Sequence, residues 1–61
     1  MELQPQECAT AAFYLKLNEQ LIGFDLEAAR RSGDQQAAKR FAEHRESLTK
    51  VIAVLEKEAT Q

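Results

Sequence analysis

Cysteine, proline, glycine and tryptophan are scarce in this chain of 61 residues, which has one cysteine, one proline, two glycines and no tryptophan. The single thiol, Cys8, excludes an intramolecular disulfide. Cys8 and His44 are the only soft metal ligands in the sequence, and no short spacing links them, so we expect no metal site. No recognisable catalytic or cofactor motif is present. The sequence therefore predicts a protein that is not an enzyme and binds no cofactor.

Long apolar runs and a strong excess of either charge are also missing. No run approaches the roughly 20 apolar residues of a membrane span. The opening "MELQPQECATAAFYL" lacks the basic segment of a secretion signal. A net charge of −2 is atypical of a general polyanion binder. Together with the lone thiol, these features predict a cytoplasmic protein without membrane association.

What the chain has is a composition of 44% apolar and 30% charged residues, which is typical of a folded chain. We expect one small domain over residues 1–61. A chain this short buries only about 60% of its unfolded surface, so it needs additional stabilisation. Since a disulfide and a metal are both disfavoured, self-association or a protein partner is the expected source.

Two helices and one turn are predicted by the positions of the helix-breaking residues. Pro5 suits the first position of a helix, and Gly33 suits the left-handed position that ends one. Asp34 then caps the next helix. The prediction is a helix over about 5–31, a turn at 32–34 and a helix over about 35–59. Such a short turn forces the helices to lie antiparallel, which makes an all-α helical hairpin.

Two apolar rows run along the first helix. The row expected to face the second helix follows a 3-4-3-4 spacing and contains Tyr14, Leu17, Leu21, Phe24 and Ala28. It matches a row on the second helix that contains Ala37, Phe41, His44, Leu48, Val51 and Leu55. Around a bend at Gly33, facing residues have numbers that sum to about 69, because both helices rise equally per residue.

The other row lies about 140° around the first helix. It consists of Cys8, Ala11, Leu15, Ile22, Leu26 and Ala29. One neighbouring helix does not cover both rows, so this row is the predicted interface with a second copy or another protein. The economical solution is a symmetric homodimer that closes a four-helix bundle. Phe13 and Val54 lie outside both rows and are candidates for an additional contact.

The turn region is rich in basic residues, and it allows two interpretations. Arg30, Arg31, Lys39 and Arg40 form a candidate anion contact for RNA or DNA. The favoured interpretation is an ordinary bend, in which Arg30 and Arg31 offset the helix dipole and Lys39 pairs with Glu43. Between the helices, Asp25 is predicted to pair with Arg45, or with His44, and to set the alignment of the hairpin, with a water-filled groove as the alternative.

The segment "LEAARRSGDQQAAKRFAEH" resembles the middle of a tetratricopeptide unit at Gly33, Asp34, Ala38 and Phe41. The first helix is too long for that repeat and no second copy exists, so no function is inferred from it. In architecture alone the chain is similar to ROP-type dimeric bundles, which bind RNA. The expected function is a small protein-binding adaptor or inhibitor that self-associates through its first helix. In size and style such a chain is similar to the antagonists that phages and mobile elements direct against a host regulator. A nucleic-acid-binding regulator is the alternative.

Overall fold

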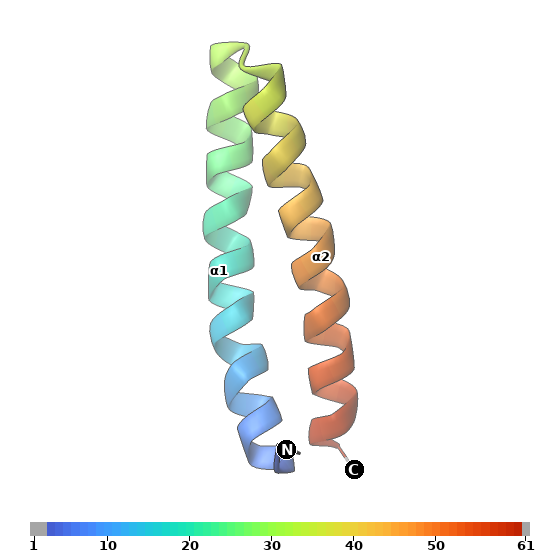
Figure 1. Cartoon of the computed structure of the whole chain (residues 1–61). Helices are drawn as coiled ribbons and strands as arrows, with labels where there is room; N and C mark the ends of the chain where they lie inside the picture. Colours follow the sequence, from blue (N-terminus) through green and yellow to red (C-terminus); the bar gives the residue numbers. More distant parts are fainter. Residues whose placement is uncertain (1–2, 61) are drawn as a thin grey trace.

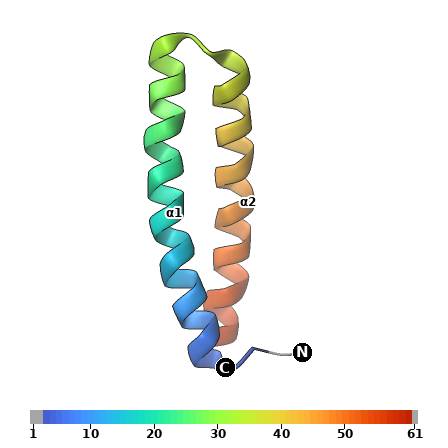
Figure 2. The ribbon, with the colours of Figure 1, turned by 60° about the vertical axis from the view of Figure 1, so that its left-hand side comes forward.

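The computed structural model describes residues 3–60, which form two helices, α1 (Pro5–Ser32) and α2 (Gln35–Ala59). The helices run antiparallel and side by side, with the turn at one end and the beginning of α1 and the end of α2 at the other (Figures 1 and 2). The prediction of an all-helical hairpin is confirmed. α1 ends one residue later than expected, and α2 has the bounds that the sequence predicts.

Local hydrogen bonds explain where α1 begins. Pro5 is its first residue. The N–H that proline lacks would form no hydrogen bond within the helix at this position, so proline is tolerated there. The carboxylate of Glu7 accepts a hydrogen bond from the backbone N–H of Gln4 at 2.8 Å. This bond satisfies one of the donors that a helix start leaves unpaired, and the negative charge favours the same end.

The turn also forms as its residues predict. Gly33 has φ 76°, in the left-handed region that glycine adopts without strain. The N–H of Gly33 donates to Arg30 O at 3.2 Å, and the N–H of Asp34 donates to Ala29 O at 2.9 Å. Asp34 Oδ1 then accepts from the N–H of Ala37 at 3.0 Å and caps α2. The chain therefore reverses within two residues, and the two helices lie in contact.

The hairpin is a thin rod. Its principal dimensions are 43 × 17 × 15 Å, and its radius of gyration is 13.8 Å. A compact domain of this length has a radius of gyration of about 10.5 Å. Two helices form a single layer, so each helix has one face against its neighbour and the rest exposed. The hydrophobic residues buried among those described are Cys8, Ala12, Leu26, Ala29 and Ile52.

The face of α1 that contacts α2 differs from the predicted one. Cys8, Leu26 and Ala29 are only 3%, 5% and 7% exposed, and Leu15 and Ile22 are half-buried. Tyr14 and Phe24, which were expected to pack against α2, are 60% and 70% exposed. The full row predicted as a free interface, Cys8, Ala11, Leu15, Ile22, Leu26 and Ala29, is therefore the row that packs inside the hairpin.

Side-chain size and charge account for this reversal. The buried row has Leu15, Ile22 and Leu26 at its centre and the small residues Cys8, Ala11 and Ala29 at its ends, so the helix axes approach more closely than they would across a row of aromatic rings. Charged residues beside the buried row also find partners across the hairpin. Lys16 pairs with Glu56, and Arg45 Nε lies 3.8 Å from Glu19 Oε1. Neither pair forms when α1 is rotated to present its aromatic residues to α2.

The register of the two helices agrees with the sequence prediction even though the face does not. Three cross-hairpin neighbours are Lys16 with Glu56, Glu19 with Arg45, and Gly23 with Arg45. Their residue numbers sum to within about five of the expected 69. Register follows from the position of the turn and the equal rise of the helices, and it is insensitive to rotation about the helix axis.

Candidate interaction surface

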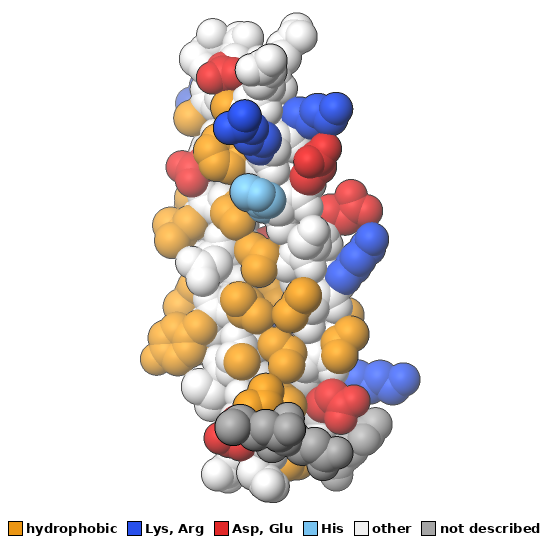
Figure 3. All heavy atoms as spheres, in the orientation of Figure 1, with side chains coloured by type: hydrophobic (Ala, Val, Ile, Leu, Met, Phe, Trp, Pro, Cys, Tyr) orange, Lys and Arg blue, Asp and Glu red, His pale blue; other side chains and the backbone are white. Residues whose placement is uncertain are grey.

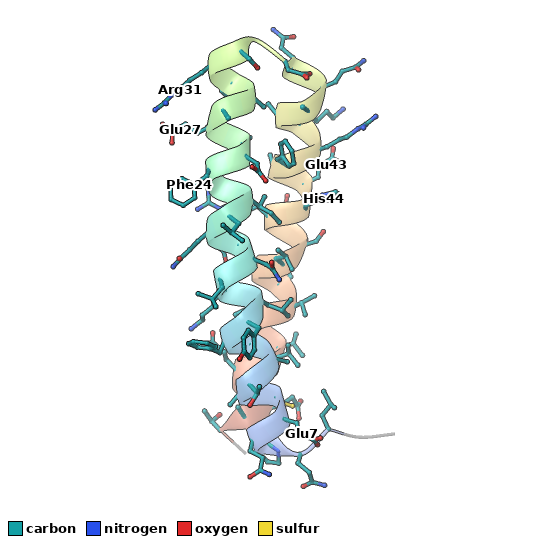
Figure 4. All side chains as sticks on the ribbon, turned by 90° about the vertical axis from the view of Figure 1, so that its left-hand side faces the viewer. Glu7, Phe24, Glu27, Arg31, Glu43 and His44 are labelled. Carbon is teal, nitrogen blue, oxygen red and sulfur yellow. The ribbon has the colours of Figure 1, made fainter. Side chains whose placement is uncertain are left out.

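An exposed apolar row lies on the side of α1 that faces away from α2. It consists of Tyr14, Leu17, Leu21 and Phe24, called the outer row below. Their exposed fractions are 60%, 43%, 59% and 70%. The 3-4-3 spacing places all four side chains along one side of the helix. Figure 4 looks onto this side of α1, and the ring of Phe24 projects from the helix away from α2.

Phe13 borders the outer row and is 58% exposed. Its ring packs edge to face on Tyr14, with 5.3 Å between the ring centroids and an interplanar angle of 86°. On its other side, Phe13 lines a shallow hollow between the helices together with Ala12 and Lys16 of α1 and Glu56 of α2. The contact with Phe13 restrains the ring of Tyr14 while leaving most of it accessible, as an interface anchor requires.

A second apolar surface lies on one side of the hairpin and spans both helices. Figure 3 shows hydrophobic side chains gathered over α1 and α2 in the half of the molecule away from the turn. Val51 and Val54 of α2 are 47% and 60% exposed, and Leu48 and Leu55 beside them are half-buried. The exposure of Val54 agrees with the sequence interpretation, whereas Val51 was expected to be covered by α1.

The basic residues of the turn region extend into solvent. Arg30, Arg31, Lys39 and Arg40 are all exposed. Arg31 Nη2 donates to Glu27 Oε1 at 3.1 Å within α1. Among residues 3–60, Lys39 and Arg40 form no ion pair, so the expected pair of Lys39 with Glu43 is absent from the structure. Further along α2, Lys50 Nζ lies 3.5 Å from Glu46 Oε1.

Three arginines contribute to the lining of a shallow hollow in the half of the hairpin nearer the turn. It is lined by Gly23, Leu26, Glu27, Arg30, Arg31 and Arg45. From the sequence, Arg45 was expected to turn inward to Asp25 and was not included in the candidate anion contact. A Cβ atom at position 23 would lie 3.9 Å from Arg45 Cζ, an ordinary van der Waals distance, so the guanidinium of Arg45 lies beside α1 at the level of Gly23. Glu27 and Glu19 partly neutralise this cluster.

The predicted polar pair of Asp25 and Arg45 is not formed. Arg45 pairs with Glu19 instead, and Asp25 is exposed. The reason is the same rotation of α1, which carries Asp25 off the groove and brings Glu19 against α2. The side chains of Arg45 and Glu19 are 50% and 28% exposed, so solvent screens the pair and its contribution is small.

His44 and Cys8 lie apart and in different surroundings. His44 was expected at the edge of the core, but its side chain is exposed and lies beside Glu43 along α2 (Figure 4). Cys8 is buried as a free thiol where α1 begins. Within residues 3–60 no three His, Cys, Asp or Glu side chains come close enough together to hold a metal ion.

Neither α1 nor α2 contains a stretch that is long and apolar enough to cross a membrane. Comparison of the chain with protein-family models, with curated proteins and with solved structures gives no match.

Proposed function

We propose that this chain is a non-enzymatic protein-binding module, that its binding surface is the outer row of α1, and that the hairpin self-associates through this row. The observation that supports the proposal is the exposure of four large side chains at 43–70% along one helix face. Contiguous exposed apolar rows of this kind generally mark an interface with another protein chain.

The small core of the hairpin supports the same proposal. Of the described large hydrophobic residues, Leu26 and Ile52 are buried, and no large side chain is fully enclosed. A two-helix chain of this size is marginally stable on its own. Covering Tyr14, Leu17, Leu21 and Phe24 in a complex adds apolar burial that the single hairpin lacks.

A helix face with this spacing binds another helix, as in coiled coils and bundles. In a cell, such a hairpin would bind a surface of another protein through the same row. It would act there either as an adaptor or as an inhibitor of the protein that it binds. We propose this class of role, with the homodimer as the form of the chain in the absence of that protein.

Light scattering tests self-association directly. We expect wild type to have the mass of two chains, and Leu21→Asp to have the mass of one while remaining helical, because Leu21 is 59% exposed in the hairpin. The matched control is Ala53→Asp, which adds the same charge at an exposed position of α2 and leaves the mass at two chains. A wild type that stays monomeric over a wide concentration range would contradict self-association.

A second candidate function is nucleic-acid binding through the turn region. It is favoured by the exposure of Arg30, Arg31, Lys39 and Arg40 and by the hollow to which Arg45 contributes. Fluorescence anisotropy with labelled RNA and DNA tests it. Binding that weakens steeply with salt and is lost in Arg40→Glu would support this function over the first.

A further inference from the structure

The outer row is symmetric about its centre. Tyr14, Leu17, Leu21 and Phe24 have a spacing of 3-4-3, whose midpoint is residue 19. We propose that the outer row pairs with the same row of a second copy in an antiparallel orientation, with a two-fold axis that crosses the interface at the level of residue 19. The inference rests on the proposed function and adds the orientation and the register of the pairing.

In an antiparallel pair centred at the level of residue 19, each residue of the outer row lies opposite a residue of the same row in the second copy. Because both helices rise equally per residue, Tyr14 of one copy lies opposite Phe24 of the other, and Leu17 lies opposite Leu21. These are the mixed layers of an antiparallel coiled coil, with the leucines at the centre and an aromatic pair at each end. Every large exposed side chain of the row then has a partner of similar size.

The residues beside the axis are compatible with a two-fold interface. A residue at such an axis faces its own copy, so a charge there is repelled by an identical charge. Asn18 and Gln20 flank the midpoint of the outer row and carry no charge. Glu19, the charged residue between them, is turned toward α2, where Arg45 Nε lies 3.8 Å away.

Charges at the ends of the row favour the antiparallel orientation. Continuing outward, Thr10 lies opposite Ala28, and Glu7 lies opposite Arg31 of the second copy. The side chain of Arg31 is 79% exposed, so it can reach a second carboxylate besides Glu27. A parallel pair instead places Glu7 against Glu7 and Arg31 against Arg31, and it brings the two basic turns together.

The available area reaches that of a specific interface. An aromatic side chain covers about 150–250 Å² when fully buried. At exposures of 58–70%, Phe13, Tyr14 and Phe24 each offer about 100 Å² or more. With Leu17 and Leu21 the contact amounts to about 500 Å² per copy, or roughly 1,000 Å² in total, the lower limit for a specific interface.

The position of α2 determines the shape of the assembly. Because the outer row faces away from α2, the two α1 helices lie at the centre and each α2 lies on the outside. The pair contains four helices, but α2 of one copy does not contact α2 of the other. Each basic turn lies at an outer end of the pair, next to the beginning of α1 of the second copy.

Cysteine cross-linking tests the orientation. Thr10→Cys and Ala28→Cys are made separately in a Cys8→Ala background, mixed in the reduced state, and oxidised. Both positions are exposed, and they face each other only in the antiparallel pair. Mass spectrometry without reduction separates the three disulfide-linked products. Random pairing makes the mixed product one half of the total, or twice as abundant as either homodimer. We expect the mixed product to exceed one half of the total and to be at least several-fold more than twice as abundant as either homodimer.

The outcomes separate this inference from the proposed function. Predominance of the two homodimers means parallel pairing, which overturns the orientation and leaves self-association intact. A random mixture at dimeric mass overturns the fixed register. Monomeric mass with no cross-link overturns both this inference and self-association. Ala53→Cys, on α2, is the matched control and is expected to cross-link with neither variant beyond background.

The cross-linking test can still be made if the Cys8→Ala background fails to fold. If circular dichroism shows that Cys8→Ala unfolds the chain, the same pair is made with Cys8 in place, because that thiol is 3% exposed and inaccessible to oxidation in the folded hairpin.

Discussion

Leu26→Ala and Leu21→Ala make the same chemical change on the same helix, and the structure predicts different results. Leu26 is 5% exposed against α2, whereas Leu21 is 59% exposed in the outer row. Removing three buried carbons costs about 2.4 kcal/mol at about 0.8 kcal/mol each. The hollow that Leu26 lines allows the site to relax, so the cavity adds little. We expect Leu26→Ala to lower the free energy of unfolding by about 2–3 kcal/mol.

For Leu21→Ala the same calculation gives a smaller decrease in the free energy of unfolding of the single hairpin. With less than half of the side chain buried, the loss is about 1 kcal/mol, and the higher helix propensity of alanine offsets part of it. Its larger effect is on the complex between copies. The unfolding midpoint of Leu21→Ala is therefore expected to depend less on chain concentration than that of wild type, since association stabilises only the folded form.

Thermal unfolding followed by circular dichroism measures both effects at two chain concentrations about a hundredfold apart. For a domain of this size, the loss at Leu26 corresponds to a midpoint lower by about 10–20 °C at either concentration. If Leu21→Ala costs as much as Leu26→Ala at the lower concentration, the assignment of the two faces of α1 is wrong, and the aromatic row is the one that packs on α2.

Three further predictions concern the turn and the polar pairs. Gly33→Ala should lower stability by about 1–2 kcal/mol in chemical denaturation, because φ is 76° and no side-chain clash contributes. Asp34→Ala should lower the free energy of unfolding by about 1 kcal/mol in the same assay, because the cap on α2 is lost. Asp34→Asn should keep most of the stabilisation that the cap provides, because asparagine also caps helices. In double-mutant cycles, Glu19→Ala with Arg45→Ala should show a coupling of about 0.5 kcal/mol or less, and Asp25→Ala with Arg45→Ala should be additive; a larger coupling to Asp25 would restore the pair that the sequence suggests.

The candidate surfaces were only partly predictable from the sequence. Arg30, Arg31, Lys39 and Arg40 lie at the exposed turn as expected, because their position depends on local sequence alone. The hollow in which Arg45 joins Arg30 and Arg31 was not predicted, since it depends on contact between the helices.

The interface residues were assigned to the wrong row for a related reason. Sequence reasoning recognised that α1 has two apolar rows and that one helix covers only one of them. It then gave the inner position to the row with the larger side chains, Tyr14, Leu17, Leu21 and Phe24. Hydrophobicity alone favours that choice, but close approach of two helices depends on small residues at the contact, such as Cys8 and Ala29.

The sequence by itself determined the helices, the turn and the register. Pro5, Gly33 and Asp34 act through backbone geometry and hydrogen bonds within a few residues, and the equal rise of the helices sets which levels meet. Only the tertiary structure decided the rotation of α1 about its own axis. That rotation depends on the combined packing of Cys8, Leu26 and Ala29 on α2 and on the ion pairs of Lys16 and Glu19, which no local pattern contains.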